Sequence, residues 1–253
     1  MRVHDAARGF EAAAGAYERG RPEYPPAAVD LIARALPLEP GTRLLDVGAG
    51  TGKLSRLAAA RGASVVALDP AHAMLRLVGG AEGIAPVRAL AEVLPFRAGA
   101  LDAVTAASSF HWFDGPLALA EIHRVLRGGG RLALLWNRRD DSAAWVARLS
   151  EVVNRREGGT PRYHRGDWRR AFDVAPGLFV PIEEAHFTHV HPLTRSGVLD
   201  RVASISFVAR MDAASREDVL AEVRGLLDAH PETAGRDALD LPYVTDVHLY
   251  ERA

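Results

Sequence analysis

The stretch Arg43-Leu-Leu-Asp-Val-Gly-Ala-Gly-Thr-Gly-Lys-Leu-Ser55 decides the fold of this chain. Residues 44–47 form a short apolar run, which predicts a buried strand. Glycines follow at three alternate positions, Gly48, Gly50 and Gly52, and an amphipathic helix is predicted to come next. A strand, a glycine turn and a helix together direct backbone N–H groups at a ligand. Glycine suits such a turn because a Cβ would hinder positive φ angles and the close approach of a ligand.

Two other glycine signatures do not fit this stretch. The dinucleotide-binding pattern G-x-G-x-x-G requires a glycine where the chain has Lys53. The P-loop pattern requires Ser or Thr after its Gly-Lys pair, and Leu54 stands there. The stretch therefore predicts neither of these two nucleotide sites.

Asp46-x-Gly48-x-Gly50-x-Gly52 instead resembles the first motif of the class I S-adenosylmethionine (SAM)-dependent methyltransferases. The resemblance implies that the loop wraps the amino-acid end of SAM and that Asp46 helps to hold its ammonium group. The residues implied to bind SAM here are Asp46, Gly48, Ala49, Gly50 and Gly52. A glycine-rich turn without a ligand is the plainer alternative, and the motifs farther along the chain argue against it.

An acidic residue follows the second predicted strand. Residues 65–68 are apolar, and Asp69 comes directly after them. In α/β nucleotide folds an acidic side chain at this place binds ribose hydroxyls. We therefore assign Asp69, with the adjacent Pro70, to the ribose of SAM. The alternative is that Asp69 caps the next helix, and the two roles are compatible.

The segment Ala91-Glu-Val-Leu-Pro-Phe96 resembles the family segment that borders the adenine ring. Many members carry an Asp two residues before the Glu, where this chain has Leu90. Adenine recognition is therefore assigned to backbone groups of Ala91 and to Glu92.

An aromatic cluster follows the fourth predicted strand, residues 101–107. In open parallel sheets, ligands bind beyond the carboxyl ends of the strands. The triplet His111-Trp-Phe113 resembles a methyltransferase subgroup that includes trans-aconitate methyltransferase-like enzymes. Ser108 and Phe110 are assigned to the SAM site because they directly follow this strand. Aromatic faces such as that of Phe110 also attract a sulfonium. His111 is the catalytic candidate because its ordinary pKa suits a general base; the alternative is a packing role.

The N-terminal segment Tyr17-Glu-Arg-Gly-Arg-Pro-Glu-Tyr-Pro-Pro26 is similar to the lid of many small-molecule methyltransferases. The resemblance implies that Arg21 pairs with the SAM carboxylate and that Tyr17 borders the methyl group. A solvated arginine and a packing tyrosine are the alternatives.

The remaining pattern predicts an α/β fold with a Rossmann-like, seven-stranded, mostly parallel sheet and an antiparallel last strand. Helices are expected on both faces, with a helical cap. We expect one methyltransferase domain over residues 1–253, with a SAM-binding core at about 40–137 and an N-terminal lid at 1–38. Residues 138–253 are expected to form the cap and a C-terminal hairpin with inserted helices. Asn137 and Arg138 close the fifth strand and are expected to line the acceptor pocket.

Composition excludes several classes of partner and site. A net charge of −1 gives no reason to expect nucleic acid or an anionic membrane as a partner. The absence of cysteine excludes disulfides and thiolate metal sites. His186, His189 and His191 would not share one strand face, so no metal site is predicted. No apolar run approaches the ~20 residues that span a bilayer, and no signal core is apparent, so we expect a cytoplasmic protein. We expect it to be a monomer or a homodimer.

Together these features predict SAM-dependent methyl transfer to an oxygen, nitrogen or carbon of a small-molecule acceptor, with S-adenosylhomocysteine as the product. One rival is a SAM-binding cyclase or other non-methylating catalyst on the same fold. A second is an NAD-dependent oxidoreductase, against which Lys53 argues. A SAM-binding regulatory module is a third.

Overall fold

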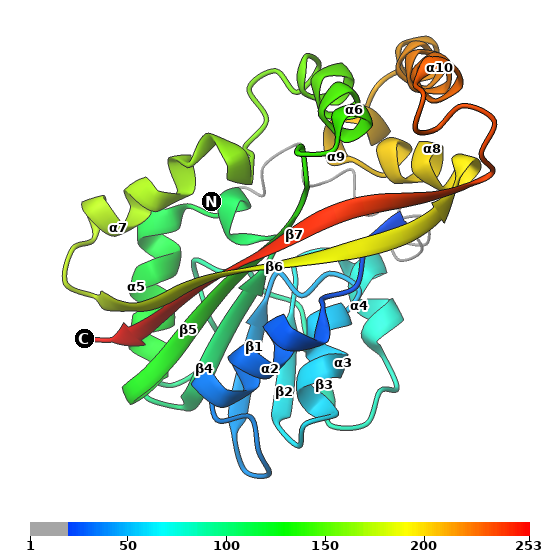
Figure 1. The fold of residues 1–253 in the computed structure, drawn as a ribbon. Coiled ribbons are helices and arrows are strands. Elements are labelled where there is room, and N and C mark those ends of the chain that lie inside the picture. Colours follow the sequence, from blue (N-terminus) through cyan, green and yellow to red (C-terminus); the bar gives the residue numbers. More distant parts are fainter. Residues whose placement is uncertain (1–19) are drawn as a thin grey trace.

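A seven-stranded sheet forms the centre of the molecule in a computed structural model that describes residues 20–253. The strand order is β3-β2-β1-β4-β5-β7-β6 (Figure 1). Strands β1 to β5 run parallel, and β7 is antiparallel to both β5 and β6. The expected α/β, Rossmann-like fold with an antiparallel last strand is confirmed. The strands are β1 (Arg43–Val47), β2 (Ser64–Leu68), β3 (Ile84–Val87), β4 (Leu101–Ala107), β5 (Leu126–Arg139), β6 (Phe179–Thr194) and β7 (Ala238–Arg252).

Helices cover both faces of the sheet because its central strands are apolar on both sides. Successive strand residues point to opposite faces. Leu44 accordingly packs in the cluster that includes Ile32 and Leu54, and Leu45 packs in the cluster that includes Leu119. The first face carries α2 (Pro26–Ala35), α3 (Lys53–Ala59) and α4 (His72–Val78), and the second carries α5 (Gly115–Val125) and α7 (Arg170–Val174).

A second helical layer stands above the carboxyl ends of the parallel strands (Figure 1). It packs on the long ends of β6 and β7, where Leu241 and Tyr243 are buried. Its helices come from two insertions, one before β6 and one between β6 and β7. They are α6 (Ala144–Asn154), α8 (Arg195–Ala203), α9 (Ser206–Ala209) and α10 (Ala213–Ala229).

The main difference from the sequence prediction lies at the start of β5. The glycine run Arg127-Gly-Gly-Gly130 is typical of a cap at the end of a helix, but β5 begins directly at Leu126. The pairing of β4 with β5 is irregular there, because Leu101 pairs with Leu126 whereas Ala103 pairs with Arg131. The glycines therefore form a bulge in the strand. The short helices α7 and α9 carry too few residues for a visible period, and the sequence missed them.

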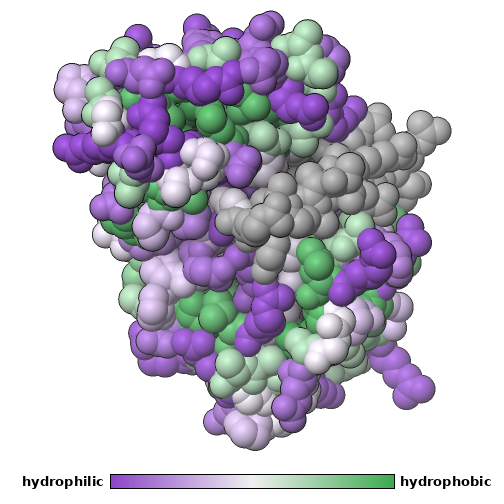
Figure 2. Space-filling view, turned by 90° about the vertical axis from the view of Figure 1, so that its right-hand side faces the viewer, coloured by the Kyte–Doolittle hydropathy of each residue, from purple (hydrophilic) through white to green (hydrophobic). Residues whose placement is uncertain are grey.

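The surface in Figure 2 intermingles hydrophilic and apolar residues over the part of the chain that the structure describes. Between residues 20 and 253, no helix combines the length and the apolar character that crossing a membrane requires. The spacing of apolar residues between positions 5 and 18 predicts a helix, and this segment lies outside the described residues.

We predict that Leu45→Ala destabilises the fold by about 2–5 kcal/mol, because Leu45 is fully buried beneath α5. The matched control is Leu77→Ala in α4, since Leu77 is 46% exposed and should change stability by less than about 0.5 kcal/mol. Urea unfolding followed by circular dichroism measures both. Equal losses in the two variants would contradict the assignment of Leu45 to the core.

Candidate active site

The glycine loop leaves β1 with three left-handed glycines. The φ angles are 67° at Gly48, 57° at Gly50 and 81° at Gly52. The backbone N–H groups of Gly48 and Ala49 both donate to the carbonyl of Leu68, at 2.7 and 3.0 Å. These bonds tie the loop to the end of β2, so the ends of the first two strands form one platform.

The three glycines have different surroundings. A Cβ on Gly48 would lie 2.5 Å from Cβ of Ser109, and a Cβ on Gly52 would lie 2.9 Å from a methyl group of Val78. A Cβ on Gly50 would meet nothing within 4 Å. Close packing therefore requires Gly48 and Gly52, whereas Gly50 faces the cavity above the loop. That cavity is also lined by Arg21, Ala49, Ser108, Asn137 and Arg201.

Asp46 lies beneath the loop rather than at its surface. Its side chain is fully buried and accepts hydrogen bonds from Oγ of Ser55 at 2.6 Å and from Oγ1 of Thr105 at 2.9 Å. Burial raises the pKa of Asp46 to about 6, against the opposing effect of these two hydroxyls. The expected contact between Asp46 and the SAM ammonium stays a prediction. Asp46 joins α3 and β4 to the end of β1.

Asp69 stands at the rim of the cavity and joins the ends of β1 and β2. Oδ2 of Asp69 accepts from the Gly50 N–H at 2.9 Å, and Oδ1 accepts from the Ala71 N–H at 2.8 Å. Burial raises the pKa of this carboxyl, whereas the two N–H donors lower it. The bond from the Ala71 N–H forms the turn that leads into α4. Asp69 therefore caps this helix, as the alternative interpretation expected, and it also stands at the open rim of the cavity. Pro70 lies next to it, and its carbonyl accepts from Arg88.

The segment expected to border adenine packs against the start of α5. Ala91 is buried, and Oε1 of Glu92 accepts from the backbone N–H of Asp114 at 2.9 Å. Asp114 in turn caps α5 through the N–H of Leu117. Glu92 thus links the loop after β3 to the loop after β4, and its role toward adenine stays a prediction.

The end of β4 is held in an unusual backbone conformation. Ser108 has a φ of 54°, although it is not glycine, and its N–H donates to the carbonyl of Leu135. Ser109 donates its hydroxyl to the carbonyl of Val47 at 2.8 Å. Such strain persists only where neighbouring structure enforces it, and it clusters at functional sites. Ser108 lines the cavity beside Gly50, as expected for a residue of the cofactor site.

Phe110 does not take the position expected of a cofactor contact. Its side chain is 1% exposed and packs edge-on against Phe113 and Trp168. This packing follows from the 3₁₀ turn Phe110–Trp112, which turns the first aromatic ring inward. Phe110 therefore anchors the turn in this structure, and its assignment to direct SAM contact stays a prediction. Phe113 lies nearer the loop, 3.2 Å from the position of a Cβ on Gly48.

His111 is held by a tryptophan from the neighbouring strand. Nε1 of Trp136 donates to Nδ1 of His111 at 3.0 Å. An indole N–H is a donor only, so Nδ1 must be the acceptor and the neutral ring carries its proton on Nε2. Both ring nitrogens are then committed, because Nδ1 is occupied and Nε2 presents a proton. The arrangement makes His111 a hydrogen-bond donor and not the expected general base.

The environment also keeps His111 uncharged. Loss of hydration, followed by the positive charges of Arg162, Arg21 and His164, lowers the pKa of His111 to about 3. His111 lines a cavity of about 370 Å³ together with Phe113, Arg162 and Trp168. This second cavity shares no lining residue with the cavity at Gly50, and part of its wall comes from residues 159–174, which we call the cap.

The segment expected to form the lid is described from residue 20 onward, and its first described residues lie beside the glycine loop. Arg21 lines the cavity, and the side-chain amide of Asn137 donates to the carbonyls of Pro22 and Glu23 at 3.4 and 3.3 Å. Glu23 also pairs with Lys53. Tyr17 lies outside the described residues, so its assignment stays a prediction.

Three arginines near the two cavities were not singled out in the sequence analysis. Arg139, Arg162 and Arg201 interact electrostatically with one another. They come from the end of β5, the loop before the 3₁₀ turn 163–165, and α8. No periodicity or motif in the sequence marks them.

The three histidines of β6 divide between the two faces of the strand. Nδ1 of His186 donates to the carboxylate of Asp246 at 2.6 Å, whereas His189 and His191 lie against the ring of Tyr243. Within residues 20–253, no group of three metal-ligating side chains comes together. Arg138 turns toward Asp246 at 2.8 Å, so only Asn137 of the expected pair faces the cavity.

Known proteins share both the sequence and this architecture. A family model described as a methyltransferase domain matches residues 45–134. An uncharacterized methyltransferase of Mycobacterium tuberculosis is 39% identical over 242 residues, which are 95% of this chain and 94% of the relative. An uncharacterized methyltransferase-like protein of Schizosaccharomyces pombe is 31% identical, with 90% of each chain covered. This chain is a methyltransferase.

The fold agrees with this family. A solved type II methyltransferase structure from Anaeromyxobacter dehalogenans superposes with a TM-score of 0.71 at 24% identity, covering 92% of this chain and 97% of that one. The prediction of a class I SAM-dependent methyltransferase is confirmed, and SAM is the cofactor of the methyltransferase. The resemblance to the trans-aconitate-like subgroup stays a prediction.

The residues around the loop fit SAM. Gly50 leaves open space where a side chain would stand, and Asp69 presents a carboxylate at the same rim. An open cradle beside an acidic rim suits a ligand that combines a polar amino-acid end with ribose hydroxyls.

We predict that Gly50→Val lowers the affinity of the methyltransferase for SAM at least about tenfold, because the new side chain enters the open cradle. Gly99→Val is the matched control, since Gly99 has a φ of 67° and equally open surroundings far from the loop. Calorimetric titration with SAM measures the affinity, and thermal unfolding shows that both variants fold. Equal SAM affinities in the two variants would remove the basis for the cradle.

His111 should remain neutral across the working range of pH. With a pKa lowered to about 3, its ring does not gain a proton between pH 5 and 8. We therefore expect its C2–H proton resonance, assigned by comparison with His111→Asn, to stay constant over that range. An inflection near the ordinary histidine value of about 6.5 would contradict the structure.

Proposed function

We propose that this methyltransferase transfers the methyl group of SAM to an oxygen, nitrogen or carbon atom of a small-molecule acceptor. We place SAM above the glycine loop and the acceptor toward the cap, within one domain formed by residues 1–253. We further propose that the protein works in the cytoplasm as a monomer or homodimer. Its net charge of −1 gives no electrostatic reason to bind nucleic acid or an anionic membrane.

The observation that carries the proposal is the bond between Asp69 and the Gly50 N–H, at 2.9 Å. It brings the acidic end of β2 and the middle of the glycine loop to one rim, above the point where β1 lies between β2 and β4. Ligands bind at such a point in open α/β sheets. Asp69 keeps acceptor capacity there, since a carboxylate accepts up to about four hydrogen bonds.

We propose the following SAM contacts around this rim. Asp69 would accept from the ribose hydroxyls, and the backbone of Ala49 and Gly50 would lie along the amino-acid end. Arg21, which lines the same cavity, would pair with the SAM carboxylate. Asp46 supports these contacts from below by holding the loop.

Bound SAM supplies an electrophilic methyl group on a positively charged sulfur. The work of the chain is then to hold the acceptor in line with that group and to exclude water. The aromatic layer formed by Trp136, Tyr163 and Trp168 closes the site on the cap side, with ring centroids of Trp136 and Tyr163 4.4 Å apart. His111, fixed by Trp136, offers its Nε2–H to the acceptor.

The size of the second cavity supports a small acceptor. Its volume of about 370 Å³ falls in the range of about 300–1,000 Å³ usual for small-molecule pockets. The wall of this cavity that belongs to the cap, between Gly159 and Val174, lies over His111 and Phe113. A small molecule fits between these layers without their separation.

The functional test is a methyl-transfer assay with SAM labelled in its methyl group and a panel of small acceptors. We expect S-adenosylhomocysteine to form together with a labelled product. Asp69→Ala should weaken SAM binding by about 1–3 kcal/mol, because the ribose hydroxyls lose their hydrogen-bond acceptor. Asp218→Ala, an exposed change on α10, is the control and should bind SAM normally.

Two outcomes would contradict the proposal. One is release of a SAM-derived product that retains the methyl group on the cofactor. The other is equal SAM affinity in Asp69→Ala and Asp218→Ala, which would detach Asp69 from the cofactor site.

A further inference from the structure

Arg201 is a buried cation without an acidic partner. It lies on α8 with 7% of its surface exposed, and its Nε donates to the hydroxyl of Tyr243 at 3.0 Å. Its Nη1 is buried and has no hydrogen-bond acceptor. No carboxylate pairs with Arg201 in the part of the chain that the structure describes. Burying an unpaired charge is costly, so a structure that retains one generally reserves it for a ligand.

Two further arginines add positive charge around it. Arg162 has its pKa lowered to about 10, chiefly by burial and then by the charges of Arg139 and Arg21, with Arg201 also contributing. Burial and the charge of Arg201 likewise lower the pKa of Arg139. The guanidinium groups therefore repel one another in surroundings that water screens poorly.

Few carboxylates oppose these charges. Glu157 lies 3.8 Å from Nε of Arg162, but it is closer to Arg165 and His164, at 2.7 and 3.3 Å. Arg139 donates to Oγ of Ser150, which donates in turn to Asp141. Arg201 is left with a neutral phenol. The cluster therefore keeps a net positive charge.

The cluster borders both cavities of the site. Arg201 lines the cavity that contains Gly50 and Ser108, and Arg162 lines the cavity that contains His111. Arg162 and Arg201 interact electrostatically with each other, so the positive charge extends from one cavity to the other. The proposed function puts the acceptor in this region.

SAM does not neutralise these charges. It carries a sulfonium, an ammonium and one carboxylate, so it brings a net positive charge to the site. Neutral His111 brings no negative charge either. An anionic second ligand would supply the compensating charge.

We propose that the methyl acceptor is a small anion, and that Arg201 and Arg162 bind its carboxylate or phosphate oxygens. The inference rests on the proposed methyl transfer and adds the chemical class of the acceptor. The planar fork of a guanidinium matches either oxyanion with two parallel hydrogen bonds. Arg201 is then a specificity residue, which neutral acceptors leave unpaired.

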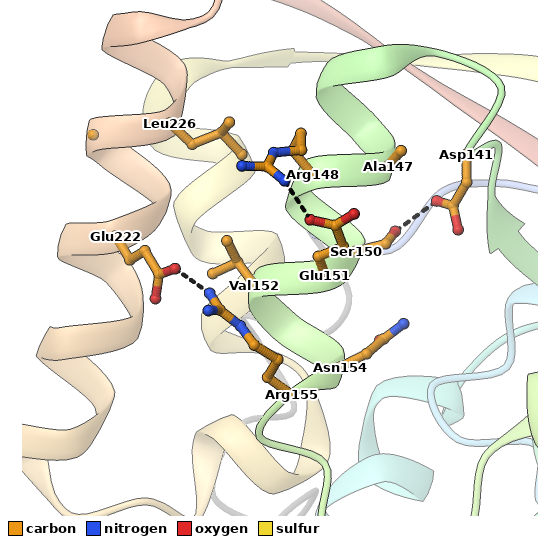
Figure 3. Close-up of a pocket in the computed structure, with 11 residues that line it drawn as sticks. Asp141, Ala147, Arg148, Ser150, Glu151, Val152, Asn154, Arg155, Glu222 and Leu226 are labelled. Atoms are coloured by element: carbon orange, nitrogen blue, oxygen red, sulfur yellow. Dashed lines mark hydrogen bonds and ion pairs between the residues drawn. The ribbon is translucent and has the colours of Figure 1, made fainter.

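Another cleft in the molecule does not share this property. It lies between α6 and α10 and has a volume of about 950 Å³ (Figure 3). Its charged side chains are already paired, Arg148 with Glu151 at 2.8 Å and Arg155 with Glu222. It therefore offers no unpaired cation to an anion, in contrast to the cavities around Arg201.

The test is calorimetric titration of the full chain, saturated with S-adenosylhomocysteine, with inorganic phosphate and separately with succinate. We expect at least one anion to bind the wild type. The anion that binds more tightly indicates whether the acceptor carries a phosphate or a carboxylate. Arg201→Met should weaken that binding about tenfold to a hundredfold, since hydrogen bonds to a charged group are lost. Its affinity for S-adenosylhomocysteine should stay within about twofold.

Two variants serve as controls. Arg201→Lys keeps the charge and should bind the anion with intermediate affinity, and Arg210→Met, an exposed change near α8, should bind it normally. Arg162→Met provides the same comparison if Arg201→Met fails to fold.

Three results would overturn the inference. Neither anion binds the wild type; Arg201→Met binds the anion as tightly as the wild type does; or Arg201→Met loses affinity for S-adenosylhomocysteine as much as for the anion. The last result would assign Arg201 to the cofactor. Failure of the wild type to bind S-adenosylhomocysteine at all would instead refute the proposed function, so the two failures are distinguishable.

Discussion

The buried carboxylate of Asp46 is the constraint on which the rest of the site depends. It accepts one hydroxyl from α3 and one from β4 directly under the glycine loop. These two bonds offset part of the cost of burying the carboxylate, which remains visible in a pKa raised to about 6. Because Asp46 joins three elements at one point, the loop above it can use three left-handed glycines without losing its shape.

From that point the site divides into a cofactor side and an acceptor side. On the cofactor side, Gly50 and Asp69 present open space and a carboxylate, and the donors of the loop are largely backbone groups. On the acceptor side, aromatic rings and arginines from the cap enclose the end of β5. Trp136 lies on β5 and also forms part of this enclosure. Its indole N–H fixes the tautomer of His111. In the proposed function, this division separates the site of the methyl donor from the site of the methyl acceptor.

Much of the fold was predictable because it follows from local patterns. The apolar run at residues 44–47 and the alternate glycines predicted β1, the loop and α3, and the structure places Leu44 and Leu45 on opposite faces of the sheet. The positions of Asp69 and Ser108 at the carboxyl ends of their strands followed from the same reasoning. The residues that directly follow a predicted parallel strand lie at its carboxyl end, so their position can be inferred from the sequence.

Side-chain directions were less predictable because distant partners set them. Asp46 turns inward because Thr105 stands 59 positions away in sequence and adjacent in space. Phe110 turns inward because Trp168 of the cap receives it. Arg201 sits in an inserted helix without a motif, and only the folded chain brings it to Tyr243.

A crystal structure of the complex with S-adenosylhomocysteine is the measurement that tests the central claim most directly. The account predicts that the ribose hydroxyls lie within hydrogen-bonding distance of the Asp69 carboxylate and that the amino-acid end lies along Gly50. A nucleoside bound elsewhere, for example in the cleft between α6 and α10, with Asp69 bonded only to Gly50 and Ala71, would contradict it.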